Sequence, residues 1–159
     1  MPLKSADICD SSDWVEVCCV QFESFGQRRS FGGTIRTVRC YEDVADLREL
    51  VKEPGQGCVL VIDGGGSLQR AILGDNMAAA LIRNGWGGVI VNGAVRDASE
   101  LNQLDFGVKA LGTNPKRGES RGGASLDVPV SFGNVTFVPG RCLVADEDGV
   151  AVLPEGMTV

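Results

Sequence analysis

The amino-acid sequence predicts an α/β fold in which helices are layered on a mixed β-sheet. Between residues 32 and 112, short apolar runs alternate with segments whose apolar residues recur at helical spacing. That alternation is typical of parallel strands joined by crossover helices. After residue 128, two segments alternate between apolar and polar residues around turn-forming pairs, which is typical of antiparallel hairpins. We therefore expect one layered domain of the α/β/α type over residues 1–159.

The first half of the chain is expected to contribute two helices and two strands. These are a short helix over 4–10, a strand over 32–40, a helix over 42–53 and a strand over 58–63. The run CVLVID is apolar up to its last residue, as in a strand covered on both faces. It ends in DGGGS, for which a tight turn with positive φ is favoured over a ligand-binding loop. The dinucleotide and Walker A spacings are both absent from that turn.

The second half is expected to alternate strands with helices and to finish in hairpins. The elements are a strand over 68–73, a helix over 75–84 stopped by Gly85, a strand over 87–93, a helix over 97–105 and a strand over 107–112. A Gly/Arg-rich loop follows, in which either Arg117 or Arg121 could approach a substrate or a neighbouring molecule. Two hairpins then turn at Gly133-Asn134 and at Asp148-Gly149.

Composition excludes several classes of function. The net charge is −6, which argues against direct binding to the phosphates of a nucleic acid. No apolar run approaches the roughly 20 residues that span a bilayer. The first residues lack the apolar core of a secretory signal. We therefore expect a cytoplasmic protein without a membrane segment.

The absence of histidine narrows the possible chemistry further. It excludes the commonest general base, the usual hydrolase triad and imidazole ligation of a metal. The six cysteines show no C-x-x-C spacing, so a zinc site is not indicated. None of the four lysines lies in an obviously buried segment, as a Schiff-base mechanism requires. Any chemistry has to use carboxylates, arginine, main-chain amides, thiols or a metal bound through oxygen.

Two short motifs are candidates for a site, and each has a structural alternative. Arg96-Asp97 follows the apolar run GGVIVNGAV, but Asp97 with Glu100 also matches a helix-capping pattern. In the stretch GDNM, Asp75 or Asn76 could cap the following helix. The same helix start offers unpaired N–H groups to a small carboxylate. Taken singly, each motif leaves both interpretations open.

The two motifs are more specific together than apart. Asp75 precedes Arg96 by a spacer of twenty residues, and Asp97 follows at once. The helix over 75–84 and the next strand belong to one α/β unit, whose helix starts and strand ends share an edge where ligands commonly bind. We therefore expect Asp75, Arg96, Asp97 and the amides of residues 74–77 to converge.

Three stretches of the chain resemble the RraA-like family. They are SFGGTIRTVRCYED, GCVLVIDGGGSLQRAILGDNMAAALIRNGWGGVIVNGAVRD, and VTFVPG together with LVADEDGVAVLP. That family includes regulators of ribonuclease activity and divalent-metal-dependent aldolases acting on 4-hydroxy-4-methyl-2-oxoglutarate, and its catalytic signature is Asp-x20-Arg-Asp. The resemblance covers nearly the whole chain. It implies an α/β/α-type fold with a swivelling β/β/α core, assembled as a homotrimer with active sites between subunits.

The resemblance also implies a role for each residue of the signature. Asp97 would be the direct carboxylate ligand of Mg²⁺ or Mn²⁺, and Asp75 would hold the waters bound to that metal. The amides of Gly74, Asp75, Asn76 and Met77 would bind the carboxylate of a pyruvate unit, and Arg96 would face its C2 oxygen. Such a site stabilises the enolate left by retro-aldol cleavage or decarboxylation of a small 2-oxo acid. It requires neither histidine nor lysine.

The expected activity is therefore a metal-dependent lyase that cleaves 4-hydroxy-4-methyl-2-oxoglutarate to pyruvate and decarboxylates oxaloacetate. Larger aldolases of the family carry a C-terminal glutamate that reaches a neighbouring active site, and the sequence up to Val159 shows no equivalent. Oxaloacetate is thus expected to be at least as good a substrate. The alternative is a protein that binds and inhibits ribonuclease E. Regulators of that kind can lack the Arg-Asp pair, so Arg96-Asp97 favours the enzyme.

Overall fold

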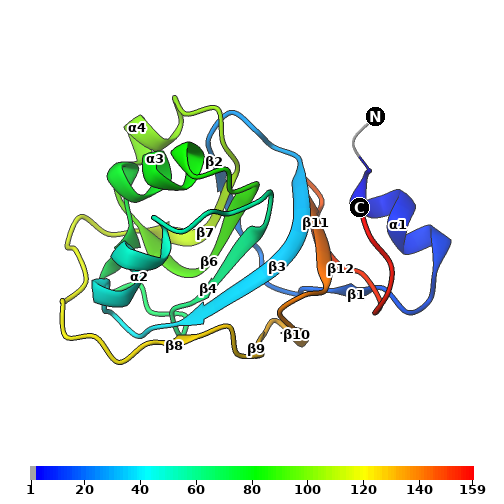
Figure 1. The fold of residues 1–159 in the computed structure, drawn as a ribbon. Helices are drawn as coiled ribbons and strands as arrows, with labels where there is room; N and C mark the ends of the chain where they lie inside the picture. Colours follow the sequence, from blue (N-terminus) through cyan, green and yellow to red (C-terminus); the bar gives the residue numbers. More distant parts are fainter. Residues whose placement is uncertain (1–2) are drawn as a thin grey trace.

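The computed structural model describes residues 3–159 and shows a curled mixed β-sheet with helices packed on it (Figure 1). The helices are α1 (Ser5–Ser11), α2 (Ala45–Leu50), α3 (Asp75–Arg83) and α4 (Ala98–Leu101). The strands are β1 (Glu16–Val17), β2 (Glu23–Phe25), β3 (Phe31–Arg39), β4 (Val59–Asp63), β5 (Ala71–Leu73), β6 (Gly88–Val95), β7 (Val108–Thr113), β8 (Ser125–Leu126), β9 (Val130–Phe132), β10 (Val135–Phe137), β11 (Cys142–Asp146) and β12 (Gly149–Val152). The predicted layered α/β fold with a mixed sheet is confirmed.

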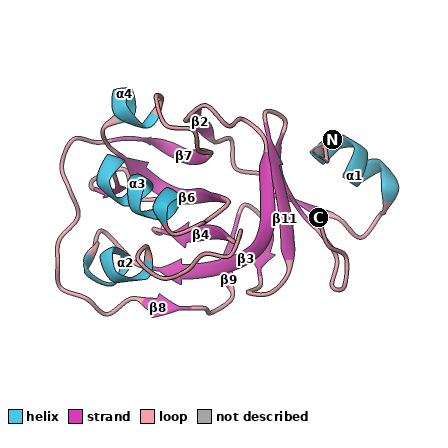
Figure 2. Cartoon of the chain, turned by 45° about the horizontal axis from the view of Figure 1, so that its top comes forward, coloured by secondary structure: helices cyan, strands magenta, loops and turns pink. Residues whose placement is uncertain are grey.

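Strand β3 joins a parallel half of the sheet to an antiparallel half (Figure 2). The strand order is β1-β12-β11-β3-β4-β6-β7-β2, with β5 beside β6 and β8 beside β3. Strands β3, β4, β6 and β7 run parallel, as strands joined by crossover helices do. In contrast, β11 pairs antiparallel with both β3 and β12. The β9–β10 hairpin forms a separate two-stranded sheet.

Helices α2, α3 and α4 cover one face of the parallel strands (Figure 2). Because successive residues of a strand point to opposite faces, Leu60 and Ile62 of β4 pack under these helices. Val59 and Val61 of the same strand pack on the side of β9 to β12. All four side chains are fully buried, which explains the unbroken apolar run of β4. The parallel strands are thus packed on both faces, so their carboxyl edge can hold the residues of a site in fixed positions.

Helix α1 packs outside the β11–β12 hairpin, at the opposite end of the molecule from α2 (Figure 1). Its Ile8 lies against Cys142, Val144 and Leu153, which form a small apolar cluster of their own. In the part of the chain from residue 3 onward, no helix is long and apolar enough to cross a membrane.

Most of the predicted strands and helices are present, with shifted bounds. The strand predicted over 87–93 continues to Val95, so β6 carries the chain two residues closer to Arg96. The strand predicted over 68–73 is limited to its last three residues in β5. The strands β1, β2 and β8 were not predicted, and each has only two or three residues.

The turn predictions are largely confirmed. Gly133 and Asn134 join β9 to β10 with φ of 61° and 63°, as a tight hairpin requires. The second hairpin turns at residues 147–148, one position earlier than predicted. In the DGGGS stretch, Gly65 and Gly66 have φ of 68° and 75°, so this segment is the expected tight turn.

The expectation that no lysine is buried is wrong for Lys109. This residue of β7 is only 4% exposed, and its Nζ donates a hydrogen bond to Ser24 Oγ at 3.1 Å. Burial away from water lowers the pKa of its ammonium group. Lys109 does not line the cleft described below, so it provides no Schiff-base nucleophile there.

Candidate active site

The two candidate motifs meet at the carboxyl edge of the parallel strands. Strand β5 runs beside the end of β6, with Leu73 opposite Val95. The main-chain N–H of Arg96 donates to the carbonyl oxygen of Leu73 at 2.9 Å. Helix α3 begins two residues after Leu73, and Arg96-Asp97 follows β6 directly. The pairing of the two strands therefore brings the helix start and the Arg-Asp pair together.

Asp97 has a left-handed backbone conformation, with φ of 60° and ψ of 42°. Few residues other than glycine adopt this region, and aspartate is one that tolerates it. Its carboxylate Oδ2 accepts a hydrogen bond from the main-chain N–H of Asp75 at 3.1 Å. It makes no capping hydrogen bond to α4. The capping role suggested by Asp97 and Glu100 is therefore wrong, because this carboxylate binds the start of α3 instead.

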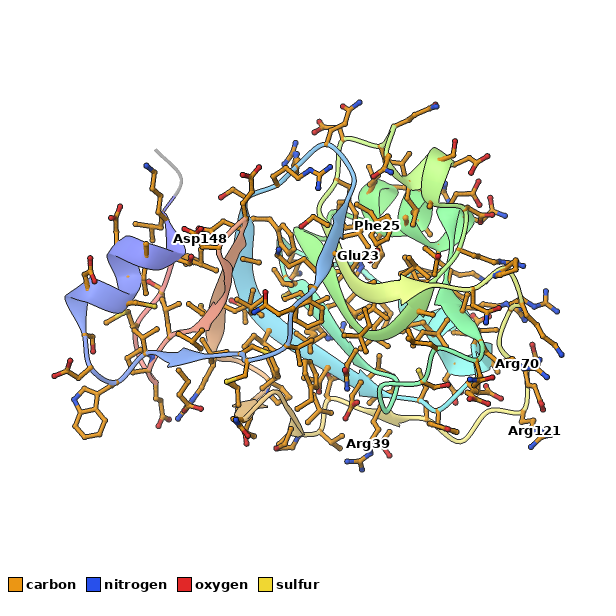
Figure 3. The ribbon with its side chains drawn as sticks, turned by 180° about the vertical axis from the view of Figure 1, so that it is seen from behind. Glu23, Phe25, Arg39, Arg70, Arg121 and Asp148 are labelled. Carbon is orange, nitrogen blue, oxygen red and sulfur yellow. The ribbon has the colours of Figure 1, made fainter. Side chains whose placement is uncertain are left out.

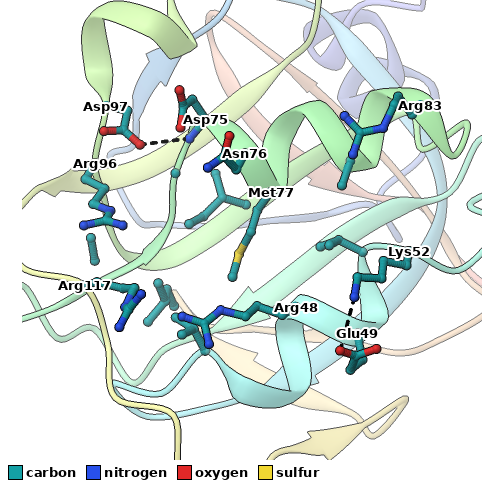
Figure 4. Close-up of a pocket in the computed structure, with 17 residues that line it drawn as sticks. Arg48, Glu49, Lys52, Asp75, Asn76, Met77, Arg83, Arg96, Asp97 and Arg117 are labelled. Atoms are coloured by element: carbon teal, nitrogen blue, oxygen red, sulfur yellow. Dashed lines mark hydrogen bonds and ion pairs between the residues drawn. The ribbon is translucent and has the colours of Figure 1, made fainter.

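The start of α3 also differs from the capping pattern expected of it. Gly74 occupies the N-cap position, Asp75 is the first helical residue, and neither Asp75 nor Asn76 is the cap. Hydrogen bonding with Asp97, partial burial and the like charge of Asp97 raise the pKa of the Asp75 carboxyl. Figure 4 shows the two acidic side chains beside each other at the helix start. Two adjacent carboxylates concentrate negative charge there and favour a bound cation.

A cleft of about 360 Å³ opens at this edge of the sheet (Figure 4). Its lining comes from α2 and its flanking residues, β5, the whole length of α3, the residues after β6 and the loop after β7. The lining residues are Val44, Arg48, Glu49, Val51, Lys52, Ala71, Ile72, Leu73, Gly74, Asp75, Asn76, Met77, Ala80, Arg83, Arg96, Asp97 and Arg117. All six residues predicted for the site, Gly74 to Met77 with Arg96 and Asp97, are among them. Five basic and three acidic side chains line the cleft, so its charge favours an anion although the whole chain is acidic.

Two further arginines of the cleft could not be assigned from the sequence. Arg48 lies on α2, and Arg117 lies in the loop between β7 and β8. Helical periodicity marks Arg48 as a polar position but does not say what that position faces. The loop has no periodicity at all, and the choice between Arg117 and Arg121 had to stay open. The structure places Arg117 at the cleft and Arg121 outside it.

The carboxylate pair fits a hard divalent cation better than it fits zinc. Within residues 3–159, no group of three or more His, Cys, Asp or Glu side chains is arranged to hold a metal. Asp75 and Asp97 offer oxygen ligands alone. Mg²⁺ is commonly bound through one or two carboxylates while it keeps several waters, and Mn²⁺ accepts the same ligands. A cation held by these two side chains would also relieve their mutual repulsion.

Comparisons with known proteins agree with this architecture. The family model described as "RraA-like: Aldolase/RraA" matches residues 5–152. A protein of Ectopseudomonas mendocina (strain ymp) is 46% identical over 154 residues, which are 96% of this chain and 95% of that protein. Its name is "Putative 4-hydroxy-4-methyl-2-oxoglutarate aldolase".

Two solved structures are similar along nearly the whole chain. The RNA-processing inhibitor RraA from Thermus thermophilis has a TM-score of 0.94 and 42% identity, covering 99% of this chain and 98% of that one. The S-adenosylmethionine: 2-dimethylmenaquinone methyltransferase from Geobacillus kaustophilus HTA426 has a TM-score of 0.92 and 41% identity, covering 94% of each chain. These relatives have different functional names, so the names alone do not assign an activity. The family is nevertheless plain from the matched length, the identity and the fold: the chain belongs to the RraA-like (Aldolase/RraA) family.

Proposed function

We propose that this chain is a divalent-metal-dependent lyase of small 2-oxo acids. It cleaves 4-hydroxy-4-methyl-2-oxoglutarate into two molecules of pyruvate, and it decarboxylates oxaloacetate. The observation that carries the proposal is the meeting of Asp75, Arg96 and Asp97 at one cleft with a surplus of basic side chains. The aldolase name borne by a relative at 46% identity supports it.

Substrate binding is proposed to use the start of α3 and the Arg96 guanidinium. A helix start presents main-chain N–H groups and a partial positive charge, both of which suit the carboxylate of a pyruvate unit. The N–H of Asp75 is already bonded to Asp97, so the N–H groups of Asn76 and Met77 are the ones proposed to bind this carboxylate. In Figure 4, no hydrogen bond or ion pair reaches the Arg96 guanidinium from the other residues that line the cleft. Its donors are therefore available to the C2 oxygen of the substrate.

Both reactions break the C3–C4 bond of the substrate and leave its electron pair on the pyruvate fragment as an enolate. In the aldol cleavage, the C4 hydroxyl passes its proton to Asp75 as the second carbonyl forms. In the decarboxylation, CO₂ leaves. Arg96 places a fixed positive charge beside the C2 oxygen, where the negative charge develops. Asp75 then returns that proton to C3 of the enolate, and in the decarboxylation it passes on a proton from solvent. Asp97 would hold a divalent cation, which would supply Lewis-acid stabilisation of the same charge.

The test is pyruvate formation from both substrates with Mg²⁺ or Mn²⁺ and with a chelator. Both activities should require the cation. Arg96→Ala and Asp97→Ala should each lower kcat by about 10²- to 10³-fold, the effect of removing a group that stabilises developing charge. The control is Arg39→Ala, an exposed arginine of β3 outside the cleft, which should keep its activity (Figure 3). An intact cation-dependent rate in Arg96→Ala would refute the proposal.

A second candidate function is binding to and inhibition of ribonuclease E. The observation that favours it is the likeness to the Thermus RNA-processing inhibitor over 99% of the chain. An acidic protein surface suits a basic segment of a partner. A pull-down with purified ribonuclease E and an RNA-cleavage assay at physiological salt test this function. No binding at micromolar concentration would remove it.

We further infer a homotrimer whose clefts lie between subunits, as is implied by the family. The assembly is compatible with either function. Sedimentation equilibrium measures it directly, and a monomer at micromolar concentration would contradict it.

A further inference from the structure

Three guanidinium groups lie along one wall of the cleft (Figure 4). Arg96 comes from the end of β6, Arg117 from the loop after β7 and Arg48 from α2. Among the residues drawn in Figure 4, none makes a hydrogen bond or ion pair with these three side chains. Outside the cleft, Arg48 donates one hydrogen bond, to Ser120 Oγ at 2.9 Å. This wall therefore carries positive charge that no carboxylate of the described cleft neutralises.

Several other basic groups nearby are paired; the exception at the cleft is Arg83, the last residue of α3, for which Figure 4 marks no partner. Lys52, on the far side of the cleft, forms an ion pair with Glu49 at 3.3 Å. Arg70 and Arg121 both pair with Glu119, and Figure 3 shows them together on the outside of the molecule. Ion pairs thus neutralise Lys52, Arg70 and Arg121, whereas no ion pair among the residues that the structure describes neutralises the three arginines of the cleft wall.

Arg117 is held at the cleft by main-chain pairing on both sides of it. The N–H of Ala71 in β5 donates to the Lys116 carbonyl oxygen at 2.7 Å, and the N–H of Gly118 donates to the Ala71 carbonyl oxygen at 2.9 Å. A Cβ at Gly118 would lie 3.0 Å from the carbonyl oxygen of Glu42, so the loop lies tightly against the segment before α2. The main chain therefore fixes the backbone of Arg117 beside the cleft, although its side chain is exposed. Binding then orders less of the chain than it would in a mobile loop.

The same loop is fastened to the α2 region, which carries Arg48. Asp43 accepts hydrogen bonds from the N–H groups of Arg121 at 2.6 Å and Gly122 at 3.1 Å, and Asp46 accepts one from the N–H of Ala124 at 2.9 Å. These two carboxylates lie just before Arg48 in the chain. Arg48 and Arg117 are therefore held in one frame, although 69 positions separate them in the sequence.

We propose that Arg48 and Arg117 form a second anion site, which binds the carboxylate remote from the 2-oxo group of a dicarboxylic 2-oxo acid. The proposal rests on the proposed function, in which the start of α3 and Arg96 bind the 2-oxo end. A carboxylate taken from water into a cleft needs a charged or hydrogen-bonding partner of its own. The 2-oxo end of the substrate already uses Arg96. The remote carboxylate is therefore proposed to bind Arg48 and Arg117. A cleft of about 360 Å³ holds a diacid of four or five carbons with room to spare.

The second anion site makes the enzyme selective for diacids. A substrate with a methyl group in place of the remote carboxylate would leave the two guanidinium groups without a carboxylate partner. Losing a charge-assisted hydrogen bond of this kind changes affinity by about 10- to 100-fold. The selectivity is set on binding, so it can be measured with acids that the enzyme does not cleave.

The experiment uses two acids that differ only at the remote end. Exchange of the pyruvate methyl protons with D₂O, followed by NMR with Mg²⁺ present, reports enolate formation. 2-Oxoglutarate and 2-oxopentanoate, which have the same five-carbon chain, compete with pyruvate in that assay. The wild-type protein should bind 2-oxoglutarate about 10- to 100-fold more tightly. Arg117→Gln and Arg48→Gln should each reduce that ratio about tenfold or more, whereas Arg121→Gln, on the same loop but outside the cleft, should keep it.

The ratio of the inhibition constants of 2-oxopentanoate and 2-oxoglutarate distinguishes a failure of the second anion site from a failure of the proposed function. A loss of affinity for the 2-oxo end, which the two acids share, affects both inhibition constants equally and cancels in their ratio. Equal inhibition by both acids in the wild-type protein, or an unchanged ratio in the double variant Arg48→Gln/Arg117→Gln, would overturn the second anion site. No pyruvate exchange in the wild-type protein with Mg²⁺ or Mn²⁺ would instead overturn the proposed function itself.

Discussion

Gly74 is required by the space around it and not by its backbone angles. Its φ of −135° and ψ of −168° are ordinary extended values that any residue adopts. A Cβ at this position would lie 2.7 Å from the carboxylate oxygen Oδ2 of Asp97 and 3.4 Å from Cγ of Arg96. The side chains of Asp97 and Arg96 therefore pass close over the glycine.

Gly74→Ala should reduce activity with little effect on stability. The added methyl group displaces the Asp97 carboxylate, and a shift of about 1 Å at a reacting group costs about 10²-fold in rate. The measurement is kcat/KM for pyruvate formation, together with thermal unfolding. Gly112→Ala is the control, because a Cβ there has only an ordinary contact of 3.6 Å with Leu68. Full activity in Gly74→Ala would show that the site tolerates a displaced Asp97.

The sequence predicts the residues of the site only where elements that are adjacent in the chain bring them together. Asp75, Arg96 and Asp97 could be predicted because one helix and one strand of the same α/β unit carry them. The left-handed conformation of Asp97 could not, because an aspartate before a helix is far more often its cap. The position of Arg117 depends on the pairing of its loop with β5, and no local sequence pattern predicts that pairing.

At the scale of elements, helix α1 is fastened to β11 by one polar contact and one apolar cluster. The main-chain N–H and the Oγ of Ser5 each donate to the Asp146 carboxylate at 2.7 Å. Burial opposes ionisation of this carboxyl, but the hydrogen bonds from Ser5 and from the N–H of Asp148 outweigh it and lower the pKa of Asp146 below its ordinary 3.8. The ionised carboxylate therefore stabilises the docked helix.

Asp146→Asn should loosen α1 at neutral pH. We expect faster amide hydrogen exchange over residues 5–11 and a free energy of unfolding lower by about 1–3 kcal/mol, the cost of losing hydrogen bonds to a charged group. Since the folded-state pKa is lowered, the stabilisation is complete well above pH 3.8 and is lost as the pH falls through the folded-state pKa. The difference from wild type should therefore shrink in acid. Asp7→Asn, an exposed acid of the same helix, should show no such difference at any pH.

The elements that could be predicted are those with a recognisable pattern of apolar residues in their own sequence. Strands β4 and β6 read as apolar runs because both faces are buried, and α3 shows apolar residues at helical spacing before its glycine stop. The short strands β1, β2 and β8 carry no such signal. Each exists because a distant strand, β12, β7 or β3, offers it a hydrogen-bonding edge.

At the scale of the whole molecule, β3 ties the two apolar cores together. Val38 of β3 belongs to the core under the helices, whereas Ile35 belongs to the core beneath the hairpins. At the first residue of the strand, the Phe31 ring lies between the backbones of Gly88 and Gly107 and would overlap a Cβ at either position. Gly88 at the start of β6 and Gly107 just before β7 thus leave space for the Phe31 ring where β3 begins.

Gly107→Ala should therefore destabilise the whole molecule and not one half of it. Overpacking of a filled site costs about 1–3 kcal/mol. Urea unfolding followed by circular dichroism and by fluorescence of buried Trp86 should show one shared transition at lower urea. The combined variant Gly107→Ala/Phe31→Leu should recover part of the loss, because the two residues touch. Two separate transitions would contradict the joining role of β3.

The cleft also has a consequence for how a dianion reaches it. The chain carries a net charge of −6, whereas the cleft has two more basic than acidic side chains. A doubly charged acid is therefore repelled while it is distant and attracted once it is near. Salt at about 0.15 M screens charges beyond roughly 8 Å, so it weakens the distant repulsion more than the close attraction. Ordinary ionic strength thus helps an acidic protein to capture an acidic molecule.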